Sequence, residues 1–261
     1  MSTLQAVDIK LDEKFENLPH APIVEAVIEI RARATKALEE TSLRASIEPK
    51  LAGYVFLDSL REFQGEVKFE SGKVSSQKVQ DVGWKGVRFR SVDMKHIAQF
   101  NRDGFVFSRL EPYVTWEQLE SEGKRLWDIY KDLAQTAEIL RLGLRYINRF
   151  KLPPGELLFE SYIQPAPSAP RDLELPFHGF MHKDTLAVPS HPYAINLIRT
   201  IQQLNGGTDG GVALILDIDV FTTQGFDLDN AVLERHLLEM RWLKNKAFFG
   251  SITDKALKMF R

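Results

Sequence analysis

Three segments of the sequence carry ionisable side chains at every second or fourth position, a spacing that places them on one face of a β-strand. Residues 140–154, LRLGLRYINRFKLPP, carry three arginines, and two other segments carry carboxylates. The opposite face of each segment is apolar, so the sequence predicts three half-buried strands whose charges complement one another. The charged residues, which we call the polar floor, are Glu25, Glu29, Arg141, Arg145, Arg149, Asp217 and Asp219.

Two interpretations of the polar floor are open. In the first, the residues form an ionic ladder on a solvated sheet face, where each cross-strand pair stabilises the fold by about 0.2–1 kcal/mol. In the second, they form the bottom of a cleft between two lobes. The planar guanidinium groups would then bind a carboxylate or a phosphate through paired hydrogen bonds. Charged side chains on a strand face usually lie in solvent and pair with one another, so the first interpretation is favoured.

Asp217 and Asp219 also resemble the acidic pair that holds Mg²⁺ or Mn²⁺ in nucleotidyl and glycosyl transferases. A third carboxylate and a phosphate-binding loop should accompany such a pair. The glycine-rich segment 205–211, NGGTDGG, lacks the Lys-Ser/Thr of a P-loop. His178 and His182 likewise lack the companions of a zinc site. We therefore predict no metal site and no cofactor, and we retain a metal-dependent enzyme for phosphorylated or nucleotide substrates as the alternative function.

Composition restricts the partners. The 34 basic and 36 acidic residues almost cancel, so no overall positive field attracts nucleic acid. Residues 83–95, GWKGVRFRSVDMK, mix aromatic and basic side chains, but they alternate as any half-exposed strand does. The chain has no cysteine, which excludes disulfides and thiol nucleophiles. Its apolar runs are too short to span a bilayer, and we expect a soluble cytoplasmic protein.

The elements that must position the polar floor can be outlined from hydrophobic periodicity. Strands are predicted over 21–34, at several places in 65–110, and over 140–151, 156–163, 177–187, 193–204 and 212–224. Helices are predicted over 35–51, 115–135 and 227–250, with a terminal helical turn capped by Ser251 or Thr253. Thr115 and Gln118 form a capping box at the start of the second helix. The proline-rich stretch 164–176 is predicted to be a loop or a lid.

Each half of the chain places its strands before one long helix that carries a tryptophan, either Trp127 or Trp242. We therefore predict an α+β fold with antiparallel meander sheets in two pseudo-repeated lobes. The lobes would be residues 20–136 and 137–261 of a single structural unit, 1–261.

Several segments resemble a family of sporadically distributed, uncharacterised prokaryotic proteins. They are LPHAPIVEAVIEI near the start, SRLEPYVTWE from Ser108, GLRYINR from Gly143, LILDIDVF from Leu214 and the closing LEMRWLKNKAFFGSITDKALKMF. The last segment departs slightly, since relatives often have a Leu-His pair where this chain has Trp242-Leu243 followed by Lys244. The resemblance spans nearly the whole chain and implies no activity, cofactor or catalytic residue. It implies a mobile or defence-type gene neighbourhood.

The sequence therefore favours a non-enzymatic binding protein that uses the polar surface between its lobes. The partner would be another protein or a small anionic ligand, and a homodimer is compatible with the sequence. No catalytic residue is assigned.

Overall fold

The computed structural model describes residues 5–70, 73–153, 158–170, 172, 175, 177–204 and 211–261. Its strands are β1 (Ile23–Ala34), β2 (Tyr54–Glu70), β3 (Lys73–Ser91), β4 (His96–Asn101), β5 (Gly104–Leu110), β6 (Thr136–Lys151), β7 (Met181–Ala187), β8 (Ala194–Gln203) and β9 (Val212–Thr222). Its helices are α1 (Glu40–Ile47), α2 (Trp116–Ala134), α3 (Asn230–Ser251) and α4 (Asp254–Leu257), with 3₁₀ turns η1 (Glu48–Lys50) and η2 (Phe159–Ser161).

The strands form one antiparallel nine-stranded sheet in the order β2-β3-β4-β5-β1-β6-β9-β8-β7. The α+β class and the antiparallel pairing are thus confirmed. The separate meander sheets are not observed, because β1 and β6 pair along most of their length and join the two halves. The pseudo-repeat is not confirmed either. The first half supplies five strands and the second four, and α1 has no counterpart among the described residues of the second half.

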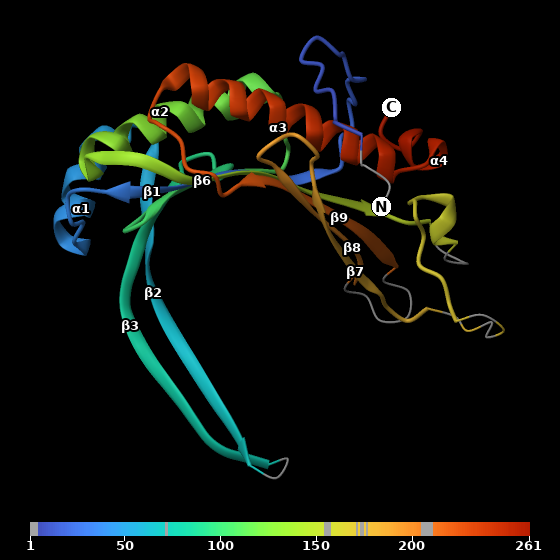
Figure 1. Ribbon diagram of the computed structural model, residues 1–261, viewed down its shortest axis with the longest axis horizontal. Helices are drawn as coiled ribbons and strands as arrows, with labels where there is room; N and C mark the ends of the chain where they lie inside the picture. Colours follow the sequence, from blue (N-terminus) through green and yellow to red (C-terminus); the bar gives the residue numbers. More distant parts are fainter. Residues whose placement is uncertain are drawn as a thin grey trace.

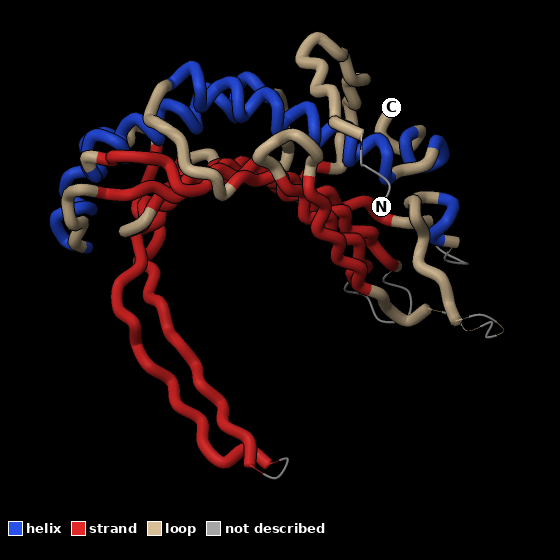
Figure 2. The backbone as a smooth tube through the Cα atoms, viewed as in Figure 1, coloured by secondary structure: helices blue, strands red, loops and turns tan. Residues whose placement is uncertain are grey.

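The sheet is curved, and α2 and α3 lie across its convex face (Figures 1 and 2). Alternation in the strands explains this arrangement, because the continuous apolar face of each of β1, β6 and β9 points toward the helices, while a few apolar side chains such as Phe221 share the charged face. Ile28, Leu144 and Ile218 are fully buried there, against Trp127 of α2 and Met240 of α3. The opposite, concave face carries the charged positions of the same strands. No helix in the described part of the chain is long and apolar enough to cross a membrane.

Strands β2 and β3 extend far beyond the rest of the sheet as a two-stranded hairpin arm (Figure 2). Only Gly86–Arg90 of β3 pairs with β4, so residues 61–70 and 73–84 pair with one another alone. Phe63 and Val79 on this arm are 61% and 62% exposed. The sequence predicted strands only from Gly65 onward. The missed start of β2, from Tyr54, lies within the main sheet, where Tyr54 and Phe56 pack against the core.

The structure shows N-cap residues predicted from the sequence at the starts of α2 and α4. The Thr115 hydroxyl accepts a hydrogen bond from the Gln118 backbone N–H at 3.3 Å, and Thr253 rather than Ser251 caps α4. Helix α3 continues one residue beyond the predicted stop at Gly250.

The strand predicted over 156–163 is wrong for its described residues, which form η2 and one isolated bridge from Ile163 to Ile252. Phe159 packs against Phe177 and Phe180, with ring centroids 6.0 and 5.1 Å away, and this local cluster favours a turn. The described residues of 164–176 form no helix or longer strand; positions 171, 173, 174 and 176 lie outside the described residues. Most of the glycine-rich turn, 205–210, lies outside them too.

Candidate functional site

The structure brings five of the seven polar-floor residues into contact on the concave face of the sheet. Arg141 on β6 reaches carboxylates on both neighbouring strands. Its Nη1 lies 2.6 Å from Oε2 of Glu29 on β1, and its Nη2 lies 3.2 Å from Oδ2 of Asp219 on β9. Burial raises the pKa of the Asp219 carboxyl. One guanidinium therefore links three adjacent strands.

Gly143 makes this bridge possible. It lies opposite Glu29 on one side and Phe221 on the other, and the Arg141 side chain occupies the space above it. A Cβ atom at position 143 would lie 2.6 Å from Arg141 Nη1. The guanidinium carbon is also 5.1 Å from the centroid of the Phe221 ring. The Arg-x-Gly spacing in the sequence thus has a steric reason.

Arg145 forms the second part of the ladder, with Asp217 on β9. Its Nε and Nη2 lie 2.8 and 2.5 Å from the two carboxylate oxygens, which is the paired geometry of a strong charge-assisted contact. Hydrogen bonding to Asp217 raises the pKa of the Arg145 guanidinium. The Asp217 side chain is only 9% exposed, whereas that of Arg145 is 46% exposed.

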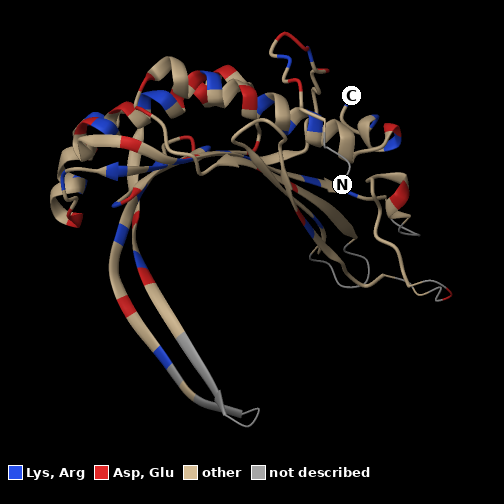
Figure 3. Ribbon diagram, in the orientation of Figure 1, with Lys and Arg blue, Asp and Glu red and all other residues tan. Residues whose placement is uncertain are grey.

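The other two predicted floor residues do not join the ladder. Arg149 contacts Glu111 instead, at 3.2 Å and near the surface. Glu25 has no ion pair among the described residues and lines a hollow of about 320 Å³ on the concave face, together with Glu29 and Arg145. Charges of both signs also alternate along the outer helices and the arm (Figure 3).

This geometry supports the ionic ladder better than the anion-binding cleft, because Arg141 and Arg145 already donate to carboxylates. Both oxygens of Asp217 accept from Arg145, and the positive charge of this guanidinium opposes a second cation there. Within the ranges that the structure describes, no three His, Asp or Glu side chains come together as a metal site requires.

Arg145→Met tests the structural role of the ladder. We expect the free energy of unfolding to fall by about 2 kcal/mol, because the buried Asp217 carboxylate would lose its partner. Urea denaturation at neutral pH measures the change. Arg149→Met is the matched control on the same strand face, and its exposed pair should contribute less than about 0.5 kcal/mol. If the two substitutions changed stability equally, the structural role of the Arg145–Asp217 pair would be contradicted.

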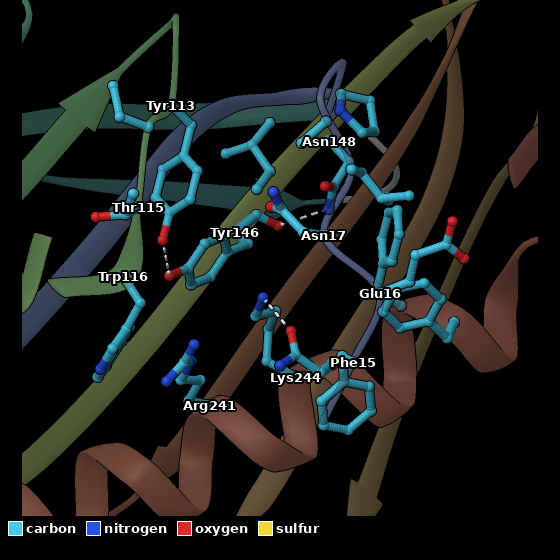
Figure 4. Close-up of a pocket in the computed structure, with 18 of the residues that line it drawn as sticks. Phe15, Glu16, Asn17, Tyr113, Thr115, Trp116, Tyr146, Asn148, Arg241 and Lys244 are labelled. Atoms are coloured by element: carbon cyan, nitrogen blue, oxygen red, sulfur yellow. Dashed lines mark hydrogen bonds between the residues drawn. The ribbon is translucent and has the colours of Figure 1, made fainter. Parts of the chain in front are cut away.

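The sequence did not reveal a larger cavity on the helix side of the sheet. We call it the α3 pocket; its volume is about 620 Å³, and it lies between residues 15–23, the start of α2, the middle of β6 and α3 (Figure 4). Its polar and aromatic lining residues include Tyr113, Trp116, Tyr146, Asn148, Arg241 and Lys244.

Two cations of α3 line this pocket without a close carboxylate. Lys244 Nζ donates to Asn245 Oδ1 at 2.5 Å and lies 4.0 Å from the centroid of the Tyr146 ring. Arg241, one turn earlier, approaches Glu117 only to 3.9 Å. Burial, together with the charge of Arg241, lowers the pKa of Lys244 to about 7. The ammonium ion is therefore poorly compensated at this position.

Neutral polar groups face the cations across the pocket. The hydroxyl oxygens of Tyr113 and Tyr146 lie 3.1 Å apart (Figure 4), and burial raises the pKa of both phenols. Only one hydroxyl hydrogen can lie between the two oxygens, so the second remains available to another acceptor. The Asn148 amide donates to the Leu216 carbonyl oxygen at 3.0 Å, which fixes its orientation.

Residues 13–22 close one side of the pocket as an N-terminal strap. Glu13 accepts hydrogen bonds from Trp242 Nε1 at 2.8 Å and from Lys246 Nζ at 3.0 Å. Phe15 stacks on Phe249 with ring centroids 5.7 Å apart. Glu16 pairs with Arg261, so its carboxylate is already compensated, although it lines the pocket.

One feature of the sequence could have identified Lys244. On α3 the buried residues Leu237, Met240 and Phe248 recur at helical spacing, and Lys244 lies on the same stripe, where an apolar residue is expected. A lysine on the apolar stripe of a core helix requires a polar space or a partner. Tyr146 was correctly placed on the buried face of its strand, but strand periodicity does not indicate a cavity.

No family model, curated protein or solved structure matches the chain at a significant level.

Proposed function

We propose that this protein binds a small anionic molecule in the α3 pocket. The observation that carries the proposal is the contrast between two sets of cations. On the polar floor Arg141 and Arg145 each donate to carboxylates within 3.2 Å. In the pocket Lys244 has no carboxylate within 4 Å among the described residues, and Arg241 has only the distant Glu117. An anionic ligand would supply the missing charge.

The size and lining of the pocket suit this role. Its volume of about 620 Å³ falls in the range of about 300–1,000 Å³ that is typical of small-molecule sites. Trp116 and Phe249 provide apolar walls, while the tyrosine hydroxyls can donate to a ligand oxygen. Such a pocket combines apolar walls with several directional polar groups.

The segments that resemble the sporadic prokaryotic family also support the proposal. SRLEPYVTWE contributes Tyr113 and Trp116, GLRYINR contributes Tyr146 and Asn148, and the closing helix contributes Lys244. Segments far apart in the sequence thus line one cavity. The polar floor supports a binding role less well, because its charges are balanced within the sheet. For the same reason it gives less support to a metal-dependent enzyme.

Native mass spectrometry of untagged protein, followed by calorimetric titration, tests the proposal. We expect a retained anion, or binding from a panel of carboxylates, sugar phosphates and nucleotides. Lys244→Met and Arg241→Met should each weaken binding by about 10- to 100-fold, the loss typical of a charge-assisted contact. Lys246→Met is the matched control, since that lysine is two residues away and pairs with Glu13.

The binding should also depend on pH. We expect tighter binding at pH 6 than at pH 8.5, because Lys244, with a pKa of about 7, gains its proton as the pH falls across this range. Equal binding by the Lys244 and Lys246 variants, or no stabilisation by any anion of the panel, would contradict the proposed function.

A further inference from the structure

Lys244 differs chemically from other lysines of the chain. Lys124, Lys131 and Lys246 each have a carboxylate oxygen within 3.0 Å. An ammonium ion has no lone pair and cannot act as a nucleophile. Lys244 instead contacts the neutral Asn245 amide and the face of the Tyr146 ring.

The groups around Lys244 favour its neutral form. Arg241 lies one turn earlier on α3 and opposes a second positive charge. Tyr146 from β6 and Tyr113 from the segment before α2 are neutral phenols. The pocket lining has two carboxylates, and neither contacts Lys244: Glu16 of the N-terminal strap pairs with Arg261, and Glu117 comes no closer than 3.9 Å to Arg241. With a pKa of about 7, Lys244 is a free amine in a large fraction of the molecules at neutral pH.

A desolvated lysine beside a second cation is the arrangement that activates an amine toward carbonyl groups. Arg241 adds a site for the rest of such a ligand, because its planar fork binds a carboxylate through two parallel hydrogen bonds. Residues three apart on a helix are neighbours, with Cβ atoms about 5–6 Å apart. A 2-oxo acid matches this short separation, since its carbonyl carbon is bonded directly to its carboxylate carbon.

We propose that Lys244 forms an imine with a 2-oxo acid whose carboxylate is bound by Arg241. This inference rests on the proposed function and names its ligand class. The Nζ lone pair attacks the carbonyl carbon to give a carbinolamine. The former carbonyl oxygen then leaves as water with the two hydrogens of the amine, and a carbon–nitrogen double bond remains. The free hydroxyl of the Tyr113–Tyr146 pair can donate a hydrogen bond to that oxygen.

Reductive trapping tests the inference on the full chain. The probes are pyruvate, 2-oxoglutarate and phenylpyruvate, each added with sodium cyanoborohydride at pH 7.5. Peptide mapping should locate the reduced adduct at Lys244, with labelling at least tenfold faster than at Lys246. Acetone, which has the carbonyl group without the carboxylate, should label Lys244 at least tenfold more slowly than pyruvate does. The labelling rate should rise between pH 6 and pH 8 as the amine loses its proton.

Lys244→Arg separates this inference from the proposed function. The variant retains a cation and should still be stabilised by anions in thermal unfolding, but it should form no adduct at position 244. Stabilisation of the wild type by anions without any adduct from the three probes would overturn the imine and leave anion binding intact. Absence of both the adduct and any anion-dependent stabilisation would overturn both. Labelling of Lys246 as fast as Lys244 would also overturn the imine. Adduct formation and its position are read from peptide mapping of the wild-type protein, so this part of the test does not depend on the folding of a variant.

Discussion

Lys244→Met should resist urea better than the wild-type protein at pH 6 and should lose this advantage by pH 10. The reason is the pKa of Lys244, which is about 7 in the folded protein against 10.5 as its ordinary value. Below pH 7 the side chain is protonated in both the folded and the unfolded chain, so the full penalty for burying the charge destabilises the fold. Between pH 7 and 10.5 only the unfolded chain retains the proton, and the penalty disappears as the pH rises.

A difference of one unit between the pKa values of the folded and the unfolded chain corresponds to about 1.4 kcal/mol. The side chain retains some contact with solvent, and methionine loses the hydrogen bond to Asn245. We therefore expect a net gain of about 2 kcal/mol for the variant at pH 6 and a difference below about 0.5 kcal/mol at pH 10. Lys246→Met is the matched control, because it removes a lysine that pairs with Glu13 near the surface, and it should show no gain in stability at pH 6. If Lys244→Met were less stable than the wild type at pH 6, the positive charge of Lys244 would have to be balanced within the folded protein.

Gly104→Ala should have the opposite and larger effect. Gly104 begins β5 with φ at +155° and lies opposite Arg31 of the central strand β1. A methyl group there would lie 2.2 Å from the Ile30 carbonyl oxygen and 2.9 Å from Arg31 Cα. These are backbone atoms, so the clash can be relieved only by moving β5 away from β1. We expect a loss of about 3 kcal/mol in the free energy of unfolding, measured in urea.

Gly65→Ala is the matched control for this substitution. Gly65 lies on the hairpin arm, where nothing is within 4 Å of an added Cβ atom. Its free energy of unfolding should stay within about 0.5 kcal/mol of the wild type. A loss below about 1 kcal/mol for Gly104→Ala would mean that the two strands adjust easily at this turn.

The sequence predicted the central strands well because one face of each is buried. Alternation placed Ile28, Leu144 and Ile218 in the core and put the charges of Arg145 and Asp217 on the opposite face. Strands whose exposed charges are opposite in sign stabilise one another when they pair, so these charges indicated cross-strand contacts. The periodicity could not show which strands are adjacent, so it did not reveal that β1 and β6 join the halves into a single sheet.

The α3 pocket could not be predicted by the same reasoning. Its walls come from the N-terminal strap, the start of α2, β6 and α3, and each contributes only a few residues. Trp116 and Tyr146 have the pattern of ordinary core residues. An unfilled space depends on how closely elements distant in sequence approach, and hydrophobic spacing within one element carries no information about that distance. Lys244 on an apolar stripe was the one local signal.

The continuity of the sheet determines how a ligand would enter and leave. Since β1 and β6 are hydrogen-bonded along most of their length, the two halves cannot swing apart to expose the pocket. The N-terminal strap is the wall held partly by ion pairs, because Glu13 and Glu16 contact Lys246 and Arg261 near the surface. Dissolved salt screens such contacts. The rate of ligand exchange would then follow the ionic strength of the surroundings, even where the affinity is set by groups deep in the pocket.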